Sequence, residues 1–357
     1  MKHLNLFAPI SSLGYGVAGL NILKELSKTI HVGLSIIGNV DANEEDSAIA
    51  QKAIDTSSLF AKEFHEAPCL KIWHEFSLAE HIGKGKYFAF PFFEINQMKD
   101  RRANHLSYVD EIVVSSQWAK DVITNENISV PISVVPLGVD RAIFTHEAHR
   151  PTDKCVFLNA GKWEKRKGHD VLLHLFQTAF PTEKDVALHM MPSNPFLPEK
   201  NNHEWQRYYT SDPRVRIFDR VATHKEVAEI MSTTNCGIFP SRAEGWNLEL
   251  LEMMSMGKHV IATNYSAHTQ FCNNDNTNLI EIDNLETADD GLFFNGTSGE
   301  WAAIEDKQIE QGVEYLRGFY KQWQSNPNII NQEGVNTAKR LSWTNTANQL
   351  EEIIYGN

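Results

Sequence analysis

Short apolar runs alternate with longer amphipathic segments along the first part of the chain. The apolar runs predict β-strands at residues 3–8, 31–38, 69–75, 86–94, 111–116 and 132–138. Segments with apolar residues at helical spacing predict helices at residues 19–27, 46–60, 99–108 and 117–124. This alternation is typical of a parallel sheet with helices on its faces.

A polar segment at residues 139–154 interrupts the pattern, which then starts again. The second series predicts strands at residues 155–161, 186–191, 215–220, 236–241, 258–264 and 291–295, helices at 170–179 and 225–232, and a helical tail from about residue 304. We therefore predict an α/β protein with two Rossmann-like domains, residues 1–150 and residues 151–339. Two such domains imply a cleft between them, faced by the carboxyl ends of both sheets.

A glycine-rich loop follows the first predicted strand and raises an alternative function. Gly14, Gly16 and Gly19 have G-x-G-x-x-G spacing and Asp41 follows, as in a dinucleotide fingerprint. However, residues 9–13 lie between the strand and the first glycine, whereas the fingerprint needs that glycine close to the strand end. An NAD-dependent oxidoreductase therefore remains the alternative interpretation.

Charge and cysteine content narrow the class of protein. The formal net charge of -13 over 357 residues argues against nucleic acid as the main partner, because phosphate neutralisation needs clustered cations. No apolar run approaches the length of a membrane span, so we expect at most peripheral membrane contact. The four cysteines have neither metal-ligand nor disulfide-framework spacing, which favours a reducing cytoplasm: Cys69, Cys155, Cys236 and Cys272.

A charged loop at the start of the second domain has two interpretations. In the sequence NAGKWEKRKGHD, Lys162 and Lys167 precede Gly168 at the predicted start of a helix. Two ammonium groups beside the first turn of a helix suit a diphosphate, because the free N–H groups and the helix dipole add to their charge. Lys165 and Arg166 in the same loop also allow a solvated basic loop with no ligand.

The segment FPSRAEGWNLELLEMMSMGK is more specific. Glu244 lies in the loop before a predicted helix, and Glu252 lies in the second turn of that helix. Both carboxylates could face one cleft, while the N–H groups around Asn247 face an incoming phosphate. Carboxylates beside a diphosphate are suited to accept hydrogen bonds from sugar or ribose hydroxyls. Glu249 places a favourable charge near the helix N-terminus.

These motifs resemble the retaining glycosyltransferases of GT-B architecture, in the large family that includes sucrose synthases and bacterial mannosyl- and glucosyltransferases. The Glu-x(7)-Glu element, the GKWEKRKG loop and the segment VVPLGVDRAIF at residues 134–144 carry the resemblance. The ending LSWTNTANQLEEIIY resembles the closing helix of the family, which crosses back to the first domain. The resemblance implies that residues 1–150, with residues 340–357, form the acceptor side and residues 151–339 bind the nucleotide sugar.

The resemblance also implies roles for single residues. Lys167 would bind the donor diphosphate, assisted by Lys162 where the family more often has arginine. Glu244 would contact hydroxyls of the transferred sugar, and Glu252 would hold the ribose. Gly16 would let the first domain approach the donor phosphates or the acceptor.

Other positions follow from the same resemblance. Glu94 takes the place where many members of the family carry a catalytic histidine, and Thr269 would lie near the donor phosphates. His74 ends a predicted strand and is interpreted either as a structural cap or as a group at the cleft. The remaining expected donor-binding residues are Trp246 and Asn247, in the turn before the predicted helix, and Leu248, at its start.

The sequence thus predicts a retaining hexosyltransferase that uses a nucleotide-diphosphate sugar and acts on a hydroxyl of a glycan or lipid-linked glycan. It contains no Asp-x-Asp triplet, so we expect cationic side chains to hold the diphosphate, with neither a metal nor a cofactor. A nucleotide-sugar-binding relative without transferase activity is a further alternative. The sugar, the nucleotide base and the acceptor are not determined by the sequence.

Overall fold

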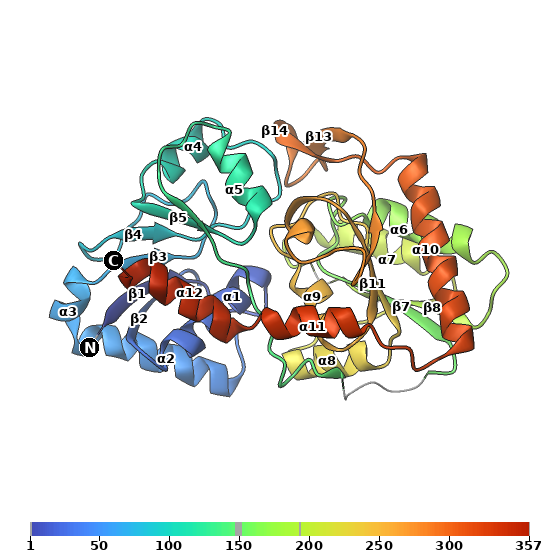
Figure 1. Cartoon of the computed structure of the whole chain (residues 1–357), viewed down its shortest axis with the longest axis horizontal. Helices are drawn as coiled ribbons and strands as arrows, with labels where there is room; N and C mark the ends of the chain where they lie inside the picture. Colours follow the sequence, from blue (N-terminus) through green and yellow to red (C-terminus); the bar gives the residue numbers. More distant parts are fainter. Residues whose placement is uncertain (1, 147–151, 193, 357) are drawn as a thin grey trace. The chain divides into compact units, whose positions relative to one another are not determined.

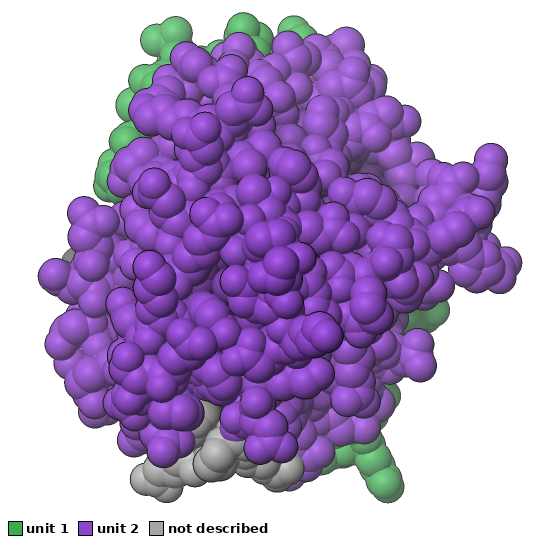
Figure 2. All heavy atoms as spheres, turned by 90° about the vertical axis from the view of Figure 1, so that its right-hand side faces the viewer, with its two compact units in different colours: residues 1–138, 341–357 green, residues 139–340 purple. Residues whose placement is uncertain are grey.

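The chain divides into two compact units. The structure is a computed structural model that describes residues 2–146, 152–192 and 194–356. One unit comprises residues 1–138 and 341–357, and the other comprises residues 139–340 (Figures 1 and 2). The expected boundary between residues 150 and 151 lies outside the described residues.

The first unit is a six-stranded parallel sheet in the order β2-β1-β3-β4-β5-β6. Its strands are β1 (His3–Ala8), β2 (His31–Ile36), β3 (Cys69–Lys71), β4 (Tyr87–Ala89), β5 (Glu111–Val114) and β6 (Ile132–Val134). Its helices are α1 (Gly14–Leu26), α2 (Glu44–Leu59), α3 (Ala61–Glu66), α4 (Arg101–Leu106), α5 (Gln117–Thr124) and α12 (Trp343–Tyr355). Leu6 of β1 pairs with Leu34 on one side and Leu70 on the other, and all three are buried.

The glycine-rich segment expected as a loop instead forms the start of α1, and the loop at residues 9–13 packs against that helix. A Cβ at Gly16 would lie 2.2 Å from the Ser11 hydroxyl oxygen, and one at Gly19 would lie 2.4 Å from the Pro9 carbonyl oxygen. These two glycines are therefore required by the packing of residues 9–11 against α1. Apart from its chain neighbours and the backbone of its own helix, none of the described residues has an atom within 4 Å of a Cβ built on Gly14.

The last helix belongs to the first unit, although it follows the second unit in the sequence. α12 lies beside α1 (Figure 1). The Thr346 hydroxyl donates to the Pro136 carbonyl at 2.8 Å, and the Tyr355 hydroxyl donates to the His3 carbonyl at 2.8 Å. The Ser342 side chain caps the helix by accepting from the N–H of Asn345.

The second unit contains a parallel sheet in the order β12-β11-β10-β7-β8-β9 and an antiparallel hairpin. Its strands are β7 (Cys155–Ala160), β8 (Val186–Met191), β9 (Val215–Ile217), β10 (Cys236–Phe239), β11 (His259–Thr263), β12 (Asn278–Ile280) and the hairpin strands β13 (Leu285–Asp289) and β14 (Asn295–Ala302). Its helices are α6 (His169–Ala179), α7 (Glu199–Tyr209), α8 (His224–Ser232), α9 (Leu248–Ser255), the 3-10 helix η2 (Ser266–Gln270), α10 (Asp306–Ser325) and α11 (Gln332–Arg340).

The core of the second unit is rich in aromatic side chains. Phe157 of β7 lies with its ring centroid 5.5 Å from Phe180 and 5.8 Å from Phe319 of α10. All three rings are almost fully buried. α10 and α6 pack against each other (Figure 1), so this core fixes the carboxyl end of β7 and the start of α6.

The predicted mixed α/β fold with two Rossmann-like sheets is confirmed. The strand predicted at residues 291–295 is wrong, because residues 291–294 form the turn of the β13–β14 hairpin. The Asp290 carboxylate accepts hydrogen bonds from the N–H groups of Leu292, Phe293 and Phe294, which holds the apolar run in a turn. No helix within the described ranges is long and apolar enough to cross a membrane.

The close packing at Gly16 predicts a stability difference between two neighbouring glycines. Gly16→Ala should lower the free energy of unfolding by roughly 1–3 kcal/mol, because the added methyl group would overlap Ser11. Gly14→Ala has open space and should be neutral or stabilising by up to about 1 kcal/mol. Urea unfolding of both variants measures the difference, and equal stabilities would contradict the packing role.

Candidate functional site

Two loops meet where the strand order of the second sheet reverses. From β7 the chain continues to β8 on one side, whereas β10 pairs with β7 on the other side. Ligands of open α/β sheets bind outside the carboxyl ends of the strands at such a switch point. The loop after β7 carries Lys162 and Lys167, and the loop after β10 carries Glu244.

Gly168 allows the two loops to approach each other. It has a φ of +76°, and a Cβ built on it would lie 2.1 Å from the Pro240 carbonyl oxygen. Only glycine fits this left-handed, crowded position. The Arg242 N–H also donates to the Arg166 carbonyl at 2.6 Å, which ties the loops together beside the site.

Glu244 lies at the centre of a buried ionic network. Its carboxylate is 3.1 Å from the Lys167 ammonium and 2.9 Å from the Arg166 guanidinium. It also accepts a hydrogen bond from the Ser241 hydroxyl at 2.8 Å. Burial alone would raise the pKa of Glu244, but the Lys167 and Arg166 charges outweigh burial and lower that pKa well below its ordinary value. Glu244 is therefore an ionised acceptor at neutral pH.

Lys167 is held as a cation in the same way. Burial would lower its pKa, but the carboxylates of Glu244 and Glu249 raise it above the ordinary value for lysine. Lys162 joins the network one step away, with its ammonium 3.0 Å from Glu164, which in turn accepts from Arg166. These three cations are matched by three carboxylates, Glu164, Glu244 and Glu249, so the network offers ammonium groups to an anionic ligand without a net charge of its own.

The turn before α9 is shaped by an unusual backbone position. Asn247 has a φ of +79°, and its side-chain oxygen accepts from the Leu250 N–H at 3.2 Å. Its side-chain nitrogen lies 2.9 Å from His268 Nε2, while His268 Nδ1 lies 3.0 Å from the Thr263 carbonyl. His268 therefore carries its proton on Nδ1, and burial lowers its pKa. This arrangement fixes the first turn of α9, whose N–H groups form an anion-binding end.

Glu252 differs from Glu244 in its electrostatics. It lies in α9 and is 8% exposed. Burial and the neighbouring Glu249 carboxylate raise its pKa well above the ordinary value. Its carboxyl group therefore takes up a proton more readily than an exposed glutamate, and once protonated it can donate as well as accept a hydrogen bond.

The other predicted donor-binding residues of this unit have varied environments. Trp246 is buried, its ring 4.8 Å from Phe271, and its Nε1 atom has no hydrogen-bond partner among the described residues. Leu248 is half-buried in the first turn of α9. Thr269 is exposed in η2, and its hydroxyl donates to the Ser266 carbonyl.

Gly16 and Glu94 belong to the first unit, Gly16 in the first turn of α1 and Glu94 in the loop after β4. Gly16 is adjacent to Tyr15, whose hydroxyl donates to the Phe92 carbonyl at 2.6 Å. The Tyr15 ring lies 4.8 Å from that of His74, so the start of α1 and the loops after β3 and β4 converge. Glu94 is half-buried in one of these loops.

Sequence reasoning missed several members of the ionic network. Arg166 and Glu164 were treated as part of a charged loop, and Ser241 was not considered. The alternation of Lys162, Glu164 and Arg166 in one short loop was the available signal, since alternating charges suit a mutually paired network. In the part of the chain that the structure describes, no group of three His, Cys, Asp or Glu residues is arranged to hold a metal ion.

The fold and this site define the class of protein that the chain resembles. HepE of Anabaena, solved in complex with UDP and glucose, matches over 100% of both chains with a TM-score of 0.69 and 13% identity. Sucrose-phosphate synthase of Thermosynechococcus elongatus matches over 99% of this chain and 98% of its own, with a TM-score of 0.68 and 13% identity. The fold is that of the GT-B glycosyltransferases, with two Rossmann-like domains.

Sequence comparison points to the same class. Residues 154–290, which include the whole ionic network, match the family model described as Glycosyl transferases group 1. A protein of Sulfolobus islandicus filamentous virus named "Putative glycosyltransferase 45" is 23% identical over 181 residues, which cover 49% of this chain and 47% of that protein. The chain thus spans about half the length of this curated relative.

Replacing the carboxyl group by an amide should change the stability of the fold in opposite directions at Glu244 and Glu252. Glu244→Gln should lower the free energy of unfolding at pH 7 by about 3–5 kcal/mol, because Lys167 and Arg166 lose a buried partner. Glu252→Gln should raise it by roughly 1–3 kcal/mol, because the wild-type carboxyl ionises only at a cost in the folded state.

The pH dependence follows from the two pKa directions. Glu244 contributes to the free energy of unfolding at every pH above its unfolded-state pKa of about 4.3. This contribution is lost as the pH falls towards the lowered folded-state pKa. The gain from Glu252→Gln should disappear below that same unfolded-state value, where both states are protonated. Urea unfolding across this range measures both, and a destabilised Glu252→Gln variant at pH 7 would contradict the assignment.

Proposed function

We propose that the protein is a retaining glycosyltransferase that moves a hexose from a nucleotide-diphosphate sugar to an acceptor hydroxyl. The observation that carries the proposal is the buried Lys167–Glu244 pair, 3.1 Å apart, beside the first turn of α9 at a switch point. A cation and helix N–H groups suit a diphosphate, and an ionised carboxylate suits sugar hydroxyls. The match of residues 154–290 to Glycosyl transferases group 1 supports this interpretation.

Each residue of the site has a role in the proposed reaction. When the bond between the sugar C1 and the diphosphate oxygen breaks, negative charge develops on the leaving diphosphate. Lys167, Lys162 and the N-terminus of α9 stabilise that charge. The acceptor oxygen bonds to C1 on the same face, and its proton passes to the departing diphosphate. Glu244 orients the sugar through its hydroxyls, and the protonated Glu252 pairs with the ribose hydroxyls.

The first unit is proposed to bind the acceptor, a glycan or lipid-linked glycan, through the start of α1, which carries Gly16, and the loop that carries Glu94. UDP-glucose is the first donor to test, because HepE has been solved with it. An NAD-dependent oxidoreductase is not favoured, because Gly16 and Gly19 already pack against Ser11 and Pro9 in the loop before α1.

Lys167→Ala should reduce transfer about 100- to 1,000-fold, because the leaving diphosphate loses its buried cation. Lys321→Ala, on the exposed face of α10, is the matched control and should keep wild-type activity. Release of nucleoside diphosphate, with and without an acceptor, measures the reaction for UDP-, GDP- and ADP-sugars. Near-normal transfer by the Lys167 variant would overturn the mechanism, and no release under any condition would favour a non-transferring binding protein.

Metal independence is a separate prediction. Because Lys167 and Lys162 supply the charge in the proposed mechanism, transfer in excess EDTA should match transfer in added Mg²⁺ or Mn²⁺. Loss of activity on chelation, restored by a divalent ion, would contradict it.

Proton NMR of the first product formed should show the anomeric configuration of the donor, whereas an inverted product would exclude the retaining mechanism.

A further inference from the structure

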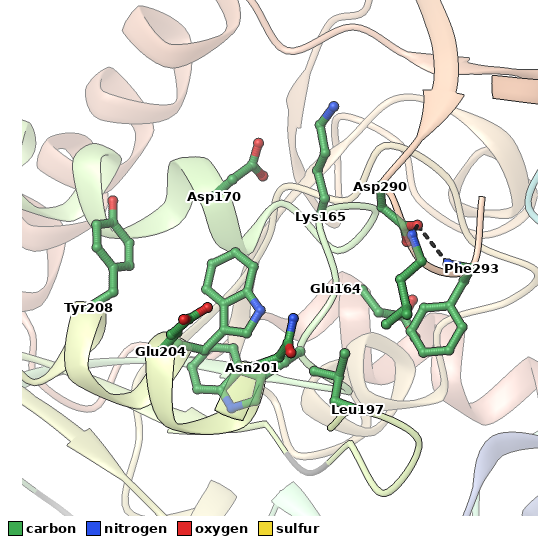
Figure 3. Close-up of a pocket in the computed structure, with 12 residues that line it drawn as sticks. Glu164, Lys165, Asp170, Leu197, Asn201, Glu204, Tyr208, Asp290 and Phe293 are labelled. Carbon is green, nitrogen blue, oxygen red and sulfur yellow. Dashed lines mark hydrogen bonds between the residues drawn. The ribbon is translucent and has the colours of Figure 1, made fainter. Parts of the chain in front are cut away.

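A pocket opens in the second unit beside the ionic network, with which it shares Glu164. It has a volume of about 510 Å³, within the usual range for small-ligand sites. α7 forms one wall, the tip of the β13–β14 hairpin forms the other, and Glu164 and Lys165 lie between them (Figure 3). Neither Lys167 nor Glu244 lines it.

The α7 wall presents aromatic side chains that are held in place. Trp205 stacks on the fully buried Trp163, with ring centroids 5.6 Å apart and planes within 7° of parallel. Tyr208 lies three residues further along α7, on the same face as Trp205, and is 41% exposed. The pocket therefore has a rigid indole backed by the core and a phenol ring open to ligand.

The hairpin wall exposes apolar side chains from a fixed turn. Leu292 and Phe293 are 49% and 42% exposed and both line the pocket. The Asp290 carboxylate accepts from their two N–H groups at 3.0 and 2.8 Å, as the dashed line to Phe293 shows in Figure 3. Apolar side chains gathered around one pocket and held by an ordered turn are typical of a binding surface.

The polar groups of the pocket select the charge of the ligand. Four carboxylates line it: Glu164, Asp170, Glu204 and Asp290. Glu164 is paired with Lys162 and Arg166, and Asp170 is paired with Arg242. Lys165, which itself donates to the Asp289 carbonyl at 3.1 Å, is the one ammonium group that lines the pocket. The two carboxylates that are not held in buried ion pairs outnumber it, which disfavours phosphates and other anions. Carboxylate oxygens and the Asn201 amide suit hydroxyl donors, and the aromatic faces suit the C–H faces of a pyranose ring.

One buried arginine connects this pocket to the ionic network. Arg242 makes two 2.8 Å contacts with Asp170 and donates to the Lys165 carbonyl at 2.7 Å. It also binds Glu286 of β13 at 2.6 Å. Since Arg242 lies two residues before Glu244, the same side chain braces the hairpin, the pocket and the loop that carries Glu244.

We propose that this pocket binds a neutral sugar residue of the acceptor glycan, outside the position where transfer occurs. That this glycan is the acceptor of the reaction rests on the proposed glycosyltransferase function. The binding of a neutral glycan to the pocket can be tested independently of that function. Trp205, Tyr208 and Phe293 provide the apolar contacts, and Asn201 and Glu204 provide the hydrogen-bond acceptors.

Calorimetric titration with maltotetraose, cellotetraose, mannotetraose and chitotetraose tests the pocket in the full chain. At least one should bind the wild type, and Tyr208→Ala with Phe293→Ala should weaken that binding at least tenfold. Tyr108→Ala, which removes a 65% exposed tyrosine of the first unit, is the matched control and should bind normally. An oligogalacturonate of equal length should bind more weakly than the neutral glycans, because its carboxylates would be repelled by the carboxylates that line the pocket.

Titration with UDP, GDP and ADP on the same variants separates this proposal from the proposed function. Unchanged nucleotide affinity with weakened glycan binding supports the pocket. Pocket-dependent glycan binding without any nucleotide binding supports the pocket and contradicts the transferase. Unchanged glycan binding in the double variant, or no glycan binding by folded wild type, overturns the pocket. Self-association that the double variant abolishes also overturns it, since a second copy would then be the occupant.

Discussion

The buried pairing of Glu244 with Lys167 and Arg166 is the constraint on which the site of the second unit depends. A buried carboxylate without cations would be protonated or would destabilise the fold, so these three side chains must be placed together. Their arrangement leaves two buried cations and an ionised carboxylate beside the start of α9. The same network that makes the buried charges tolerable therefore creates a place suited to a diphosphate and a sugar.

Close backbone approach makes that pairing possible. Gly168 lets the loop after β7 touch Pro240 in the loop after β10, and Arg242 extends the connection to α6 and the hairpin. An interior braced in this way loses little freedom when a ligand binds, because the donors and acceptors are already oriented. In the first unit, Gly16 allows a similar close approach, but its neighbour is Ser11 in the loop just before α1 rather than a second charged segment.

The hairpin shows how local chemistry can overrule an apolar pattern. Residues 291–295 read as a strand because apolar residues predominate, yet Asp290 gathers three N–H groups and turns the chain. The helix α7 was also missed, since its exposed face is strongly polar and only Tyr209 is buried. Both elements line the pocket beside the ionic network, so the pattern of apolar residues gave little information about that surface.

By itself, the sequence determined the alternation of strands and helices, the two α/β units and the residue types of the site. Those features depend on local periodicity and on motifs within short segments. Tertiary structure alone decided that β7 lies next to β10, because strand order depends on long-range packing. That order brings Lys167 to Glu244, which lies 77 positions further along the chain, and adds Arg166 as a second cation on the same carboxylate. The charge state of Glu252 was likewise decided by burial, which a sequence does not record.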